Sequence, residues 1–224
     1  AEIYRTPVIL LLDELVAHMR ERLEIPEPEK IPLAERLTTS VKEGVDYHPY
    51  LPREDGRLPM SDFGGVHRFN VTGLFHDMWG FPSSEPSSVH GLLRHLVDKV
   101  ENRSHQLARY KEFYTGDAEQ LLLSYGSAAR SALHTLEDRR QRGERLGLLE
   151  LQTLWPFPED IVREKCAEKK SVVVVEQNMG QVLQSVKLAV DEPDKVFLAN
   201  RIDGVFITPA DIMNILRLIQ GKGV

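Results

Sequence analysis

The sequence predicts an α/β protein in which a mainly parallel sheet carries helices on both faces. Short, continuously apolar runs alternate four times with helical segments after residue 117, and such runs are typical of strands buried in a parallel sheet. The segments between the runs are long enough to form right-handed crossover helices. A chain of 224 residues, 42% of them hydrophobic, is also large enough to bury a core.

The first expected element is a buried strand at residues 7–12, which read Pro-Val-Ile-Leu-Leu-Leu. Asp13 is then a plausible cap for a helix that we expect to reach Arg22. A buried strand needs neighbouring strands, and the sequence nearby supplies none that are obvious. Because position 1 is also not Met, we expect the chain to be an internal or C-terminal fragment.

An irregular arm is expected next. Residues 26–86 contain eight prolines and no sustained helical or strand period. A connection of this length inside a compact protein is usually disordered or functional. Its large apolar side chains indicate that it packs against something, so we expect it to be ordered. These side chains are Phe63, Phe69, Leu74, Phe75, Trp79 and Phe81.

From residue 87 to residue 114, apolar residues recur at helical spacing. This pattern predicts one long amphipathic helix that ends near Gly116. Four strand–helix units are expected to follow. The strands are predicted at 121–124, 146–151, 172–175 and 196–199, and the helices at 127–142, 158–169, 180–190 and 209–220. Asn178 with Gln181, and Thr208 with Asp211, have the spacing of helix-capping pairs.

Composition excludes several classes of function. Lys and Arg total 28 against 34 Asp and Glu, a net charge of -6, so neither nucleic acid nor a membrane is an expected partner. The single cysteine, Cys166, can neither form an internal disulfide nor hold an iron–sulfur cluster alone. No apolar run approaches the length of a membrane span, and no signal peptide is evident. We therefore expect a cytoplasmic protein.

The sequence contains no dinucleotide, P-loop, zincin or α/β-hydrolase motif, and we expect no metal site. His76 and Asp77 could together orient an imidazole for acid–base chemistry, but a structural or interface role is the stronger interpretation. Glu176, Asn178 and Gln181 follow a buried strand and open a helix, where parallel sheets bind ligands. Simple helix capping is the stronger alternative there.

Five segments carry a resemblance to a known family: residues 7–14, 69–77, 125–130, 154–158 and 176–181. Together, in this order and spacing, they resemble the alpha subunit of 2-oxoacid:ferredoxin oxidoreductases, most closely the 2-oxoglutarate type. The resemblance runs over essentially the whole chain.

This resemblance implies an enzyme that oxidatively decarboxylates a 2-oxoacid, with 2-oxoglutarate expected, and forms an acyl-coenzyme A. It implies thiamine diphosphate and Mg shared with a beta subunit, and iron–sulfur clusters only in partner chains. Gamma and ferredoxin-like subunits are further implied partners in an oligomer. The family's Tyr-Pro-Ile-Thr-Pro-like motif and its activating glutamate are not in this sequence, so no catalytic residue is carried over and no cofactor-binding residue is assigned.

The resemblance also implies a division of the chain. Residues 1–25 would end a pyrimidine-binding domain, 26–116 would form the arm and long helix, and 117–220 would resemble the C-terminal domain of transketolase. We expect this portion to serve mainly subunit assembly. The expected interface residues are Phe75, His76, Asp77, Trp79, Glu176, Asn178 and Gln181. Two alternatives remain open: a non-catalytic α/β interaction module, and the beta chain of a lipoamide-linked 2-oxoacid dehydrogenase.

Overall fold

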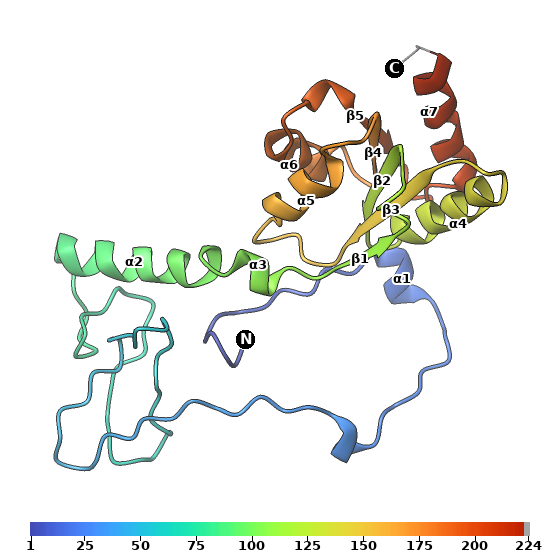
Figure 1. Cartoon of the computed structure of the whole chain (residues 1–224). Coiled ribbons are helices and arrows are strands. Elements are labelled where there is room, and N and C mark those ends of the chain that lie inside the picture. The colour runs from blue at the N-terminus through green and yellow to red at the C-terminus, as the bar shows by residue number, and fades with distance from the viewer. Residues whose placement is uncertain (222–224) are drawn as a thin grey trace. The chain divides into compact units, whose positions relative to one another are not determined.

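The computed structural model describes residues 1–221 (Figure 1). The chain divides into two compact units. Unit 1 comprises Ala1–Leu11 and Arg20–Arg103, and unit 2 comprises Leu12–Met19 together with the chain from Ser104 onward. Each unit is internally connected by its own contacts, so each is described by itself.

Unit 2 is built on a five-stranded sheet in the order β1-β3-β2-β4-β5. The strands β2, β3, β4 and β5 run parallel, and β1 pairs antiparallel with β3. β4 is buried along its whole length between β2 and β5, as its run of valines predicts. The expected mainly parallel sheet is therefore confirmed. The strand bounds are β1 Tyr110–Phe113, β2 Gln120–Tyr125, β3 Leu146–Leu151, β4 Ser171–Glu176 and β5 Val196–Asn200.

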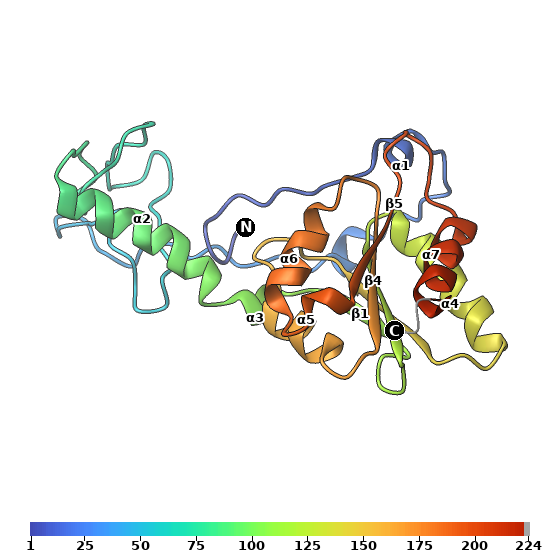
Figure 2. The ribbon, with the colours of Figure 1, turned by 90° about the horizontal axis from the view of Figure 1, so that it is seen from above.

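Helices cover both faces of this sheet, as Figure 2 shows. α4 (Ala128–Gln141) and α7 (Pro209–Gly221) pack on one face, and α5 (Glu159–Cys166) and α6 (Gln181–Ala189) pack on the other. Side chains of β2 alternate between the two cores: Leu121 and Leu123 face α5 and α6, whereas Leu122 faces α4 and α7. A 3₁₀ turn, η2 (Pro193–Lys195), leads into β5.

Unit 1 is largely irregular around one helix, α2 (Pro86–Glu101), with a 3₁₀ turn η1 at Pro28–Lys30. Tyr47 connects two parts of the arm, because its hydroxyl donates to the Pro59 carbonyl and accepts the Ser61 N–H. The Tyr47 ring also lies close to those of His67 and Phe69. The arm is therefore held by aromatic and hydrogen-bonded contacts of its own.

The expected strand at residues 7–12 is wrong for this chain. These residues belong to no strand, and Ile9 and Leu10 are each 81% exposed. The physical reason is that no strand among the described residues lies beside them to accept their backbone hydrogen bonds. The helix that follows is also shorter than expected: α1 spans only Glu14–His18.

The expected single helix from 87 to 114 is also corrected. α2 ends at Glu101, a short helix α3 spans Ser104–Leu107, and the chain then enters β1. As an edge strand, β1 sends Tyr110 to the core under α5 and α6 and Phe113 to the core under α4 and α7. The same apolar residues that fit helical spacing thus serve both faces of the sheet.

Among residues 1–221, no helix is long and apolar enough to cross a membrane.

Candidate functional site

The strongest candidate site lies at the carboxyl ends of β2 and β4. These strands are neighbours in the sheet, but the chain leaves β2 toward α4 on one face and β4 toward α6 on the opposite face. The two loops therefore leave the sheet toward opposite faces. In open α/β sheets, ligands bind at such a switch point.

Glu176, at the end of β4, is fully buried. Its carboxylate accepts the N–H groups of Val182 and Leu183, each at 3.1 Å, in the first turn of α6. It also accepts the Tyr125 hydroxyl at 3.0 Å. Burial, together with the charge of Glu176, raises the pKa of Tyr125. Glu176 is thus a carboxylate that caps a helix and fixes the neighbouring strand end.

Asn178 closes the turn that follows. Its Oδ1 accepts the N–H groups of Gly180 and Gln181, at 2.9 and 3.1 Å, and its side-chain amide donates to the Tyr125 hydroxyl. Gln181 contributes to the turn through its backbone N–H, and the residue that caps α6 is Gly180, with φ +98°. The expected capping pair of Asn178 and Gln181 is therefore wrong in its detail: α6 begins two residues further on than that spacing indicates, and Asn178 instead shapes the turn that precedes the helix.

The loop after β2 is held from two sides. The Ser127 hydroxyl donates to Gln177 Oε1 at 3.1 Å, which joins the two loops, and the Ser127 N–H donates to Asp13 Oδ2 at 2.8 Å. Gly126 allows this approach, because its φ is +58° and a Cβ there would lie 3.2 Å from the Asp13 carboxylate. Asp13 therefore places a negative charge at the N-terminus of α4, which favours one.

The polar groups of this site mainly bond to one another and connect the two loops, so few of them are free to react. The N–H donors at the start of α6 are taken by Glu176 and Asn178, and that of Ser127 is taken by Asp13. Among the described residues, no group of three or more His, Cys, Asp and Glu side chains could hold a metal ion. Cys166 is fully buried, and burial raises the pKa of its thiol to about 12.

In unit 1, His76 and Asp77 are engaged separately. His76 is buried at 4% exposure, its ring stacks on Tyr50 at 4.6 Å, and its Nε2 lies 3.0 Å from Thr72 Oγ1. Asp77 Oδ1 instead accepts the backbone N–H groups at positions 79 and 81 and so shapes a tight turn. The possible imidazole–carboxylate pair is therefore not formed.

The turn shaped by Asp77 presents aromatic side chains. Phe75 and Trp79 remain 43% and 46% exposed, and the Trp79 ring meets the His48 ring edge-on at 4.1 Å. Gly80 has φ +88°, and a Cβ there would lie 2.9 Å from Pro49, so only glycine fits this position. Trp79 is thus held in one place on the surface of unit 1.

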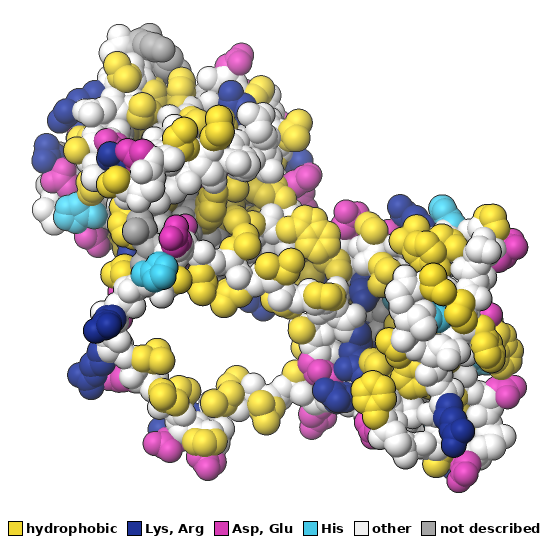
Figure 3. All heavy atoms as spheres, turned by 180° about the vertical axis from the view of Figure 1, so that it is seen from behind, with side chains coloured by type: hydrophobic (Ala, Val, Ile, Leu, Met, Phe, Trp, Pro, Cys, Tyr) yellow, Lys and Arg dark blue, Asp and Glu magenta, His cyan; other side chains and the backbone are white. Residues whose placement is uncertain are grey.

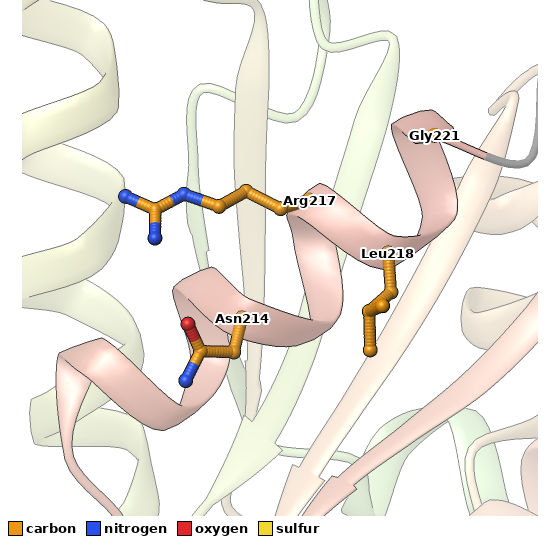
Figure 4. A pocket seen from close by; sticks show the side chains of 4 residues that line it. All are labelled: Asn214, Arg217, Leu218 and Gly221. Atoms are coloured by element: carbon orange, nitrogen blue, oxygen red, sulfur yellow. The ribbon is translucent and has the colours of Figure 1, made fainter.

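A hollow of about 570 Å³ beside α7 is not indicated by any sequence motif. It is lined by Asn214, Arg217, Leu218 and Gly221, all on this one helix (Figure 4). A smaller hollow of about 250 Å³ lies where α7 meets β5. The larger one offers a single cationic side chain and no converging set of polar groups, so it is a weaker candidate than the switch point.

Comparison with known proteins gives a consistent result. Residues 118–212 match the family described as pyruvate:ferredoxin oxidoreductase core domain II. The chain is 35% identical over 96% of its length to the 2-oxoglutarate synthase subunit KorA of Methanothermobacter marburgensis, and 36% identical over 96% to that of Methanothermobacter thermautotrophicus. It is 28% identical over 99% of its length to the ketoisovalerate oxidoreductase subunit VorB of the latter organism.

A solved structure shares the fold. It is the 2-oxoglutarate:ferredoxin oxidoreductase from Magnetococcus marinus, with 2-oxoglutarate, coenzyme A and succinyl-CoA bound. The TM-score is 0.75 at 21% identity, over 86% of this chain and 33% of that one. The present chain spans only 56% and 57% of the two KorA subunits that it matches.

Proposed function

Because this chain belongs to the 2-oxoacid:ferredoxin oxidoreductase subunits and is most like their 2-oxoglutarate type, we propose that it is part of the alpha subunit of such an enzyme. The whole enzyme would convert a 2-oxoacid, with 2-oxoglutarate as the candidate, to an acyl-coenzyme A with thiamine diphosphate. This portion would serve mainly the assembly of the subunits.

One observation carries the assembly role: the polar groups at the switch point of unit 2 are bonded to one another. Glu176, Asn178 and Ser127 each have partners within the chain. A catalytic site needs groups that are free to contact the substrate, whereas an interface needs a fixed surface. The exposed tip of this loop is Met179, 77% accessible, and exposed methionine is common at binding surfaces.

The apolar run at residues 8–12 supports the proposed division of the chain. Five consecutive aliphatic side chains are 66–81% exposed, and a contiguous apolar surface of this kind marks an interaction site. Figure 3 shows exposed hydrophobic side chains, in yellow, on the face of the molecule that it draws. We propose that residues 1–25 complete a pyrimidine-binding domain whose sheet covers this run. Residues 26–116 and 117–220 would be the arm with its helices and the transketolase-like domain.

The cofactors would be held elsewhere in the complex. The described residues do not fit a magnesium–diphosphate site, because that site needs several converging oxygen ligands and no such cluster of acidic groups and histidines is present among them. As the family resemblance implies, thiamine diphosphate and Mg would be shared with a beta subunit, and iron–sulfur clusters would lie in partner chains. Cys166, the last residue of α5, is fully buried in the core and is not available as a cluster ligand.

The proposed contact surfaces are the arm from 46 to 82 and the loop from 176 to 181. Within the arm, Phe75 and Trp79 would contact the partner, while buried His76 and the turn-forming Asp77 would hold them in place. Within the loop, Met179 would make contact, while Glu176, Asn178 and Gln181 fix its shape.

Association measurements test this proposal. The chain, or the longer subunit that contains it, is mixed with the beta subunit and followed by sedimentation velocity. Trp79→Ala and Met179→Ala should weaken association by about 2 kcal/mol for a buried anchor and leave the melting temperature nearly unchanged. Asn178→Ala should instead lower stability by about 1 kcal/mol.

Leu188→Ala is the matched control, because Leu188 is 88% exposed on α6 outside both surfaces. Its association should equal that of the unaltered chain. If Trp79→Ala and Met179→Ala associate as well as Leu188→Ala, the two surfaces are not subunit contacts.

A further inference from the structure

Unit 1 gathers four basic side chains at one end of α2, and one of them, Lys99, is buried. His95, Lys99 and Arg103 follow one another at intervals of four residues, which places them on one side of the helix and its C-terminal extension. Arg5 joins them from the N-terminal segment, through a hydrogen bond from Lys99 Nζ to its carbonyl. We name these four residues the basic centre. Like charges at this spacing repel one another, so their gathering needs a compensating group.

Lys99 is the least satisfied member. It is 4% exposed, and its ammonium donates one hydrogen bond, at 3.0 Å to the Arg5 carbonyl. An ammonium group has three donors, and no ion pair of Lys99 exists within residues 1–221. Burial lowers its pKa. A buried cation without an anion is costly unless something else neutralises it.

Arg103 has the same deficit. Its guanidinium donates to the carbonyls of Lys99 and Asp55, at 3.0 and 2.6 Å, and lies 5.5 Å from the centre of the Tyr4 ring. These partners are neutral, and in the part of the chain that the structure describes no carboxylate pairs with it. Lys99 and Arg103 therefore form no ion pair with any of the residues 1–221.

Two further nitrogen atoms in the basic centre are buried and have no hydrogen-bond partner. They are Arg5 Nε and His95 Nε2. Burial and the nearby charges of Lys99 and Arg103 lower the pKa of His95, whereas Asp98 raises it. Buried polar atoms in folded proteins are nearly always satisfied by protein groups, water or a ligand, so a water or a ligand atom is expected beside each of these two nitrogens.

The carboxylates of unit 1 near the basic centre already form ion pairs with other cations. The pairs are Glu2 with Arg5 and Arg36, Asp55 with Arg57, and Asp98 with Arg94. Each of these carboxylates thus already has a cationic partner, and none of them forms an ion pair with Lys99 or Arg103. A bound anion would supply the negative charge that the described residues do not.

We propose that the basic centre of unit 1 binds a phosphate group, either as the free ion or as part of a phosphorylated small molecule. Phosphate carries nearly two negative charges and several acceptor oxygens, which match two unpaired cations and two unpartnered nitrogens. Arg and Lys together are the usual side chains of such sites.

The test is isothermal titration of the 224-residue chain with inorganic phosphate and, separately, with ADP, each at constant ionic strength. Saturable binding is expected. Lys99→Met and Arg103→Met should each weaken it by at least about tenfold, the effect of losing one charge-assisted hydrogen bond. Lys42→Met is the matched control, since Lys42 is an exposed lysine of the same unit, and it should bind as the unaltered chain does.

Thermal unfolding without phosphate gives a second readout, because Lys99→Met removes a buried unpaired charge and should raise the melting temperature of unit 1. Tighter binding of ADP than of phosphate would assign a phosphorylated molecule, and equal binding would assign the free ion. Absence of saturable binding by both, or equal affinity of Lys99→Met and the unaltered chain, would overturn the proposal.

Discussion

At the scale of single residues, Glu176 satisfies several hydrogen-bond donors at once. One buried carboxylate takes two N–H donors of α6 and the hydroxyl of Tyr125. The sequence places Glu176 and Asn178 correctly at the end of a strand and the start of a helix. It gives no sign that Asp13 or Tyr125 joins them, because Asp13 meets Ser127 across 114 positions. Contacts of that range depend on the folded sheet and not on local spacing.

The charge of Glu176 is expected to matter for stability. Glu176→Gln keeps the size of the side chain but turns amide hydrogens toward backbone N–H donors. The free energy of unfolding of unit 2 should therefore fall by about 1–3 kcal/mol. Urea unfolding followed by Trp155 fluorescence measures this difference. Glu168→Gln, at an exposed position, should change little; equal effects of the two variants would show that the buried carboxylate is not a stabilising cap.

The raised pKa of Tyr125 predicts that unit 2 loses stability in alkaline solution. Its folded pKa is raised by burial and by Glu176, so the folded state favours the protonated phenol. This stabilisation is fully present below the unfolded pKa of about 10 and is lost as the pH rises above it. Unfolding of unit 2 measured between pH 8 and pH 11 should show a slope that Tyr125→Phe reduces. Tyr50→Phe, in unit 1, should leave that slope unchanged.

At the scale of elements, the four strand–helix units could be predicted because the local signals agree with one another. Apolar runs, crossover lengths and the Thr208–Asp211 cap all indicate the same fold, and the Thr208 hydroxyl does bond the Asp211 carboxylate. β1 was missed because Tyr110 and Phe113 fit a helical pattern as well as an edge strand. The run at 8–12 has the composition of a strand, but whether it forms one depends on a neighbouring strand and not on the segment alone.

The exposed run at 8–12 leads to a prediction for the isolated chain. Open aliphatic surface of this kind promotes association between copies, so the chain alone should self-associate at high concentration. Replacing Ile9 and Leu11 together by Lys should reduce this self-association in sedimentation equilibrium. The control replaces Leu33, which is 86% exposed and lies outside this run, by Lys. Unchanged association of the double variant would mean that another surface is responsible.

At the scale of the whole molecule, the chain contains a folded α/β unit and a separately connected arm unit, and it spans little more than half of the KorA relatives. The exposed apolar run, the aromatic turn and the Met179 loop are all surfaces that a larger assembly would cover. The sequence resemblance predicted the family correctly. It could not assign contacts to a partner, because those depend on residues of another chain.

The chain alone is expected not to bind thiamine diphosphate tightly, since no group of three or more His, Cys, Asp and Glu side chains among its described residues could hold the magnesium ion. Isothermal titration with thiamine diphosphate and magnesium should give no saturable heat at micromolar concentrations. The complex with a beta subunit serves as the positive control and should bind. Saturable binding by the chain alone would place the cofactor site within these residues.

The central claim, that this chain is part of a 2-oxoacid:ferredoxin oxidoreductase, is tested most directly by an activity measurement on the native complex. The chain is tagged in the cell that produces it, purified with whatever accompanies it, and assayed anaerobically with 2-oxoglutarate, coenzyme A and methyl viologen. The account predicts dye reduction that requires both 2-oxoglutarate and coenzyme A, and that is lowered in a Trp79→Ala preparation because less partner is retained. A purified complex that reduces no dye with 2-oxoglutarate or any other 2-oxoacid would contradict it.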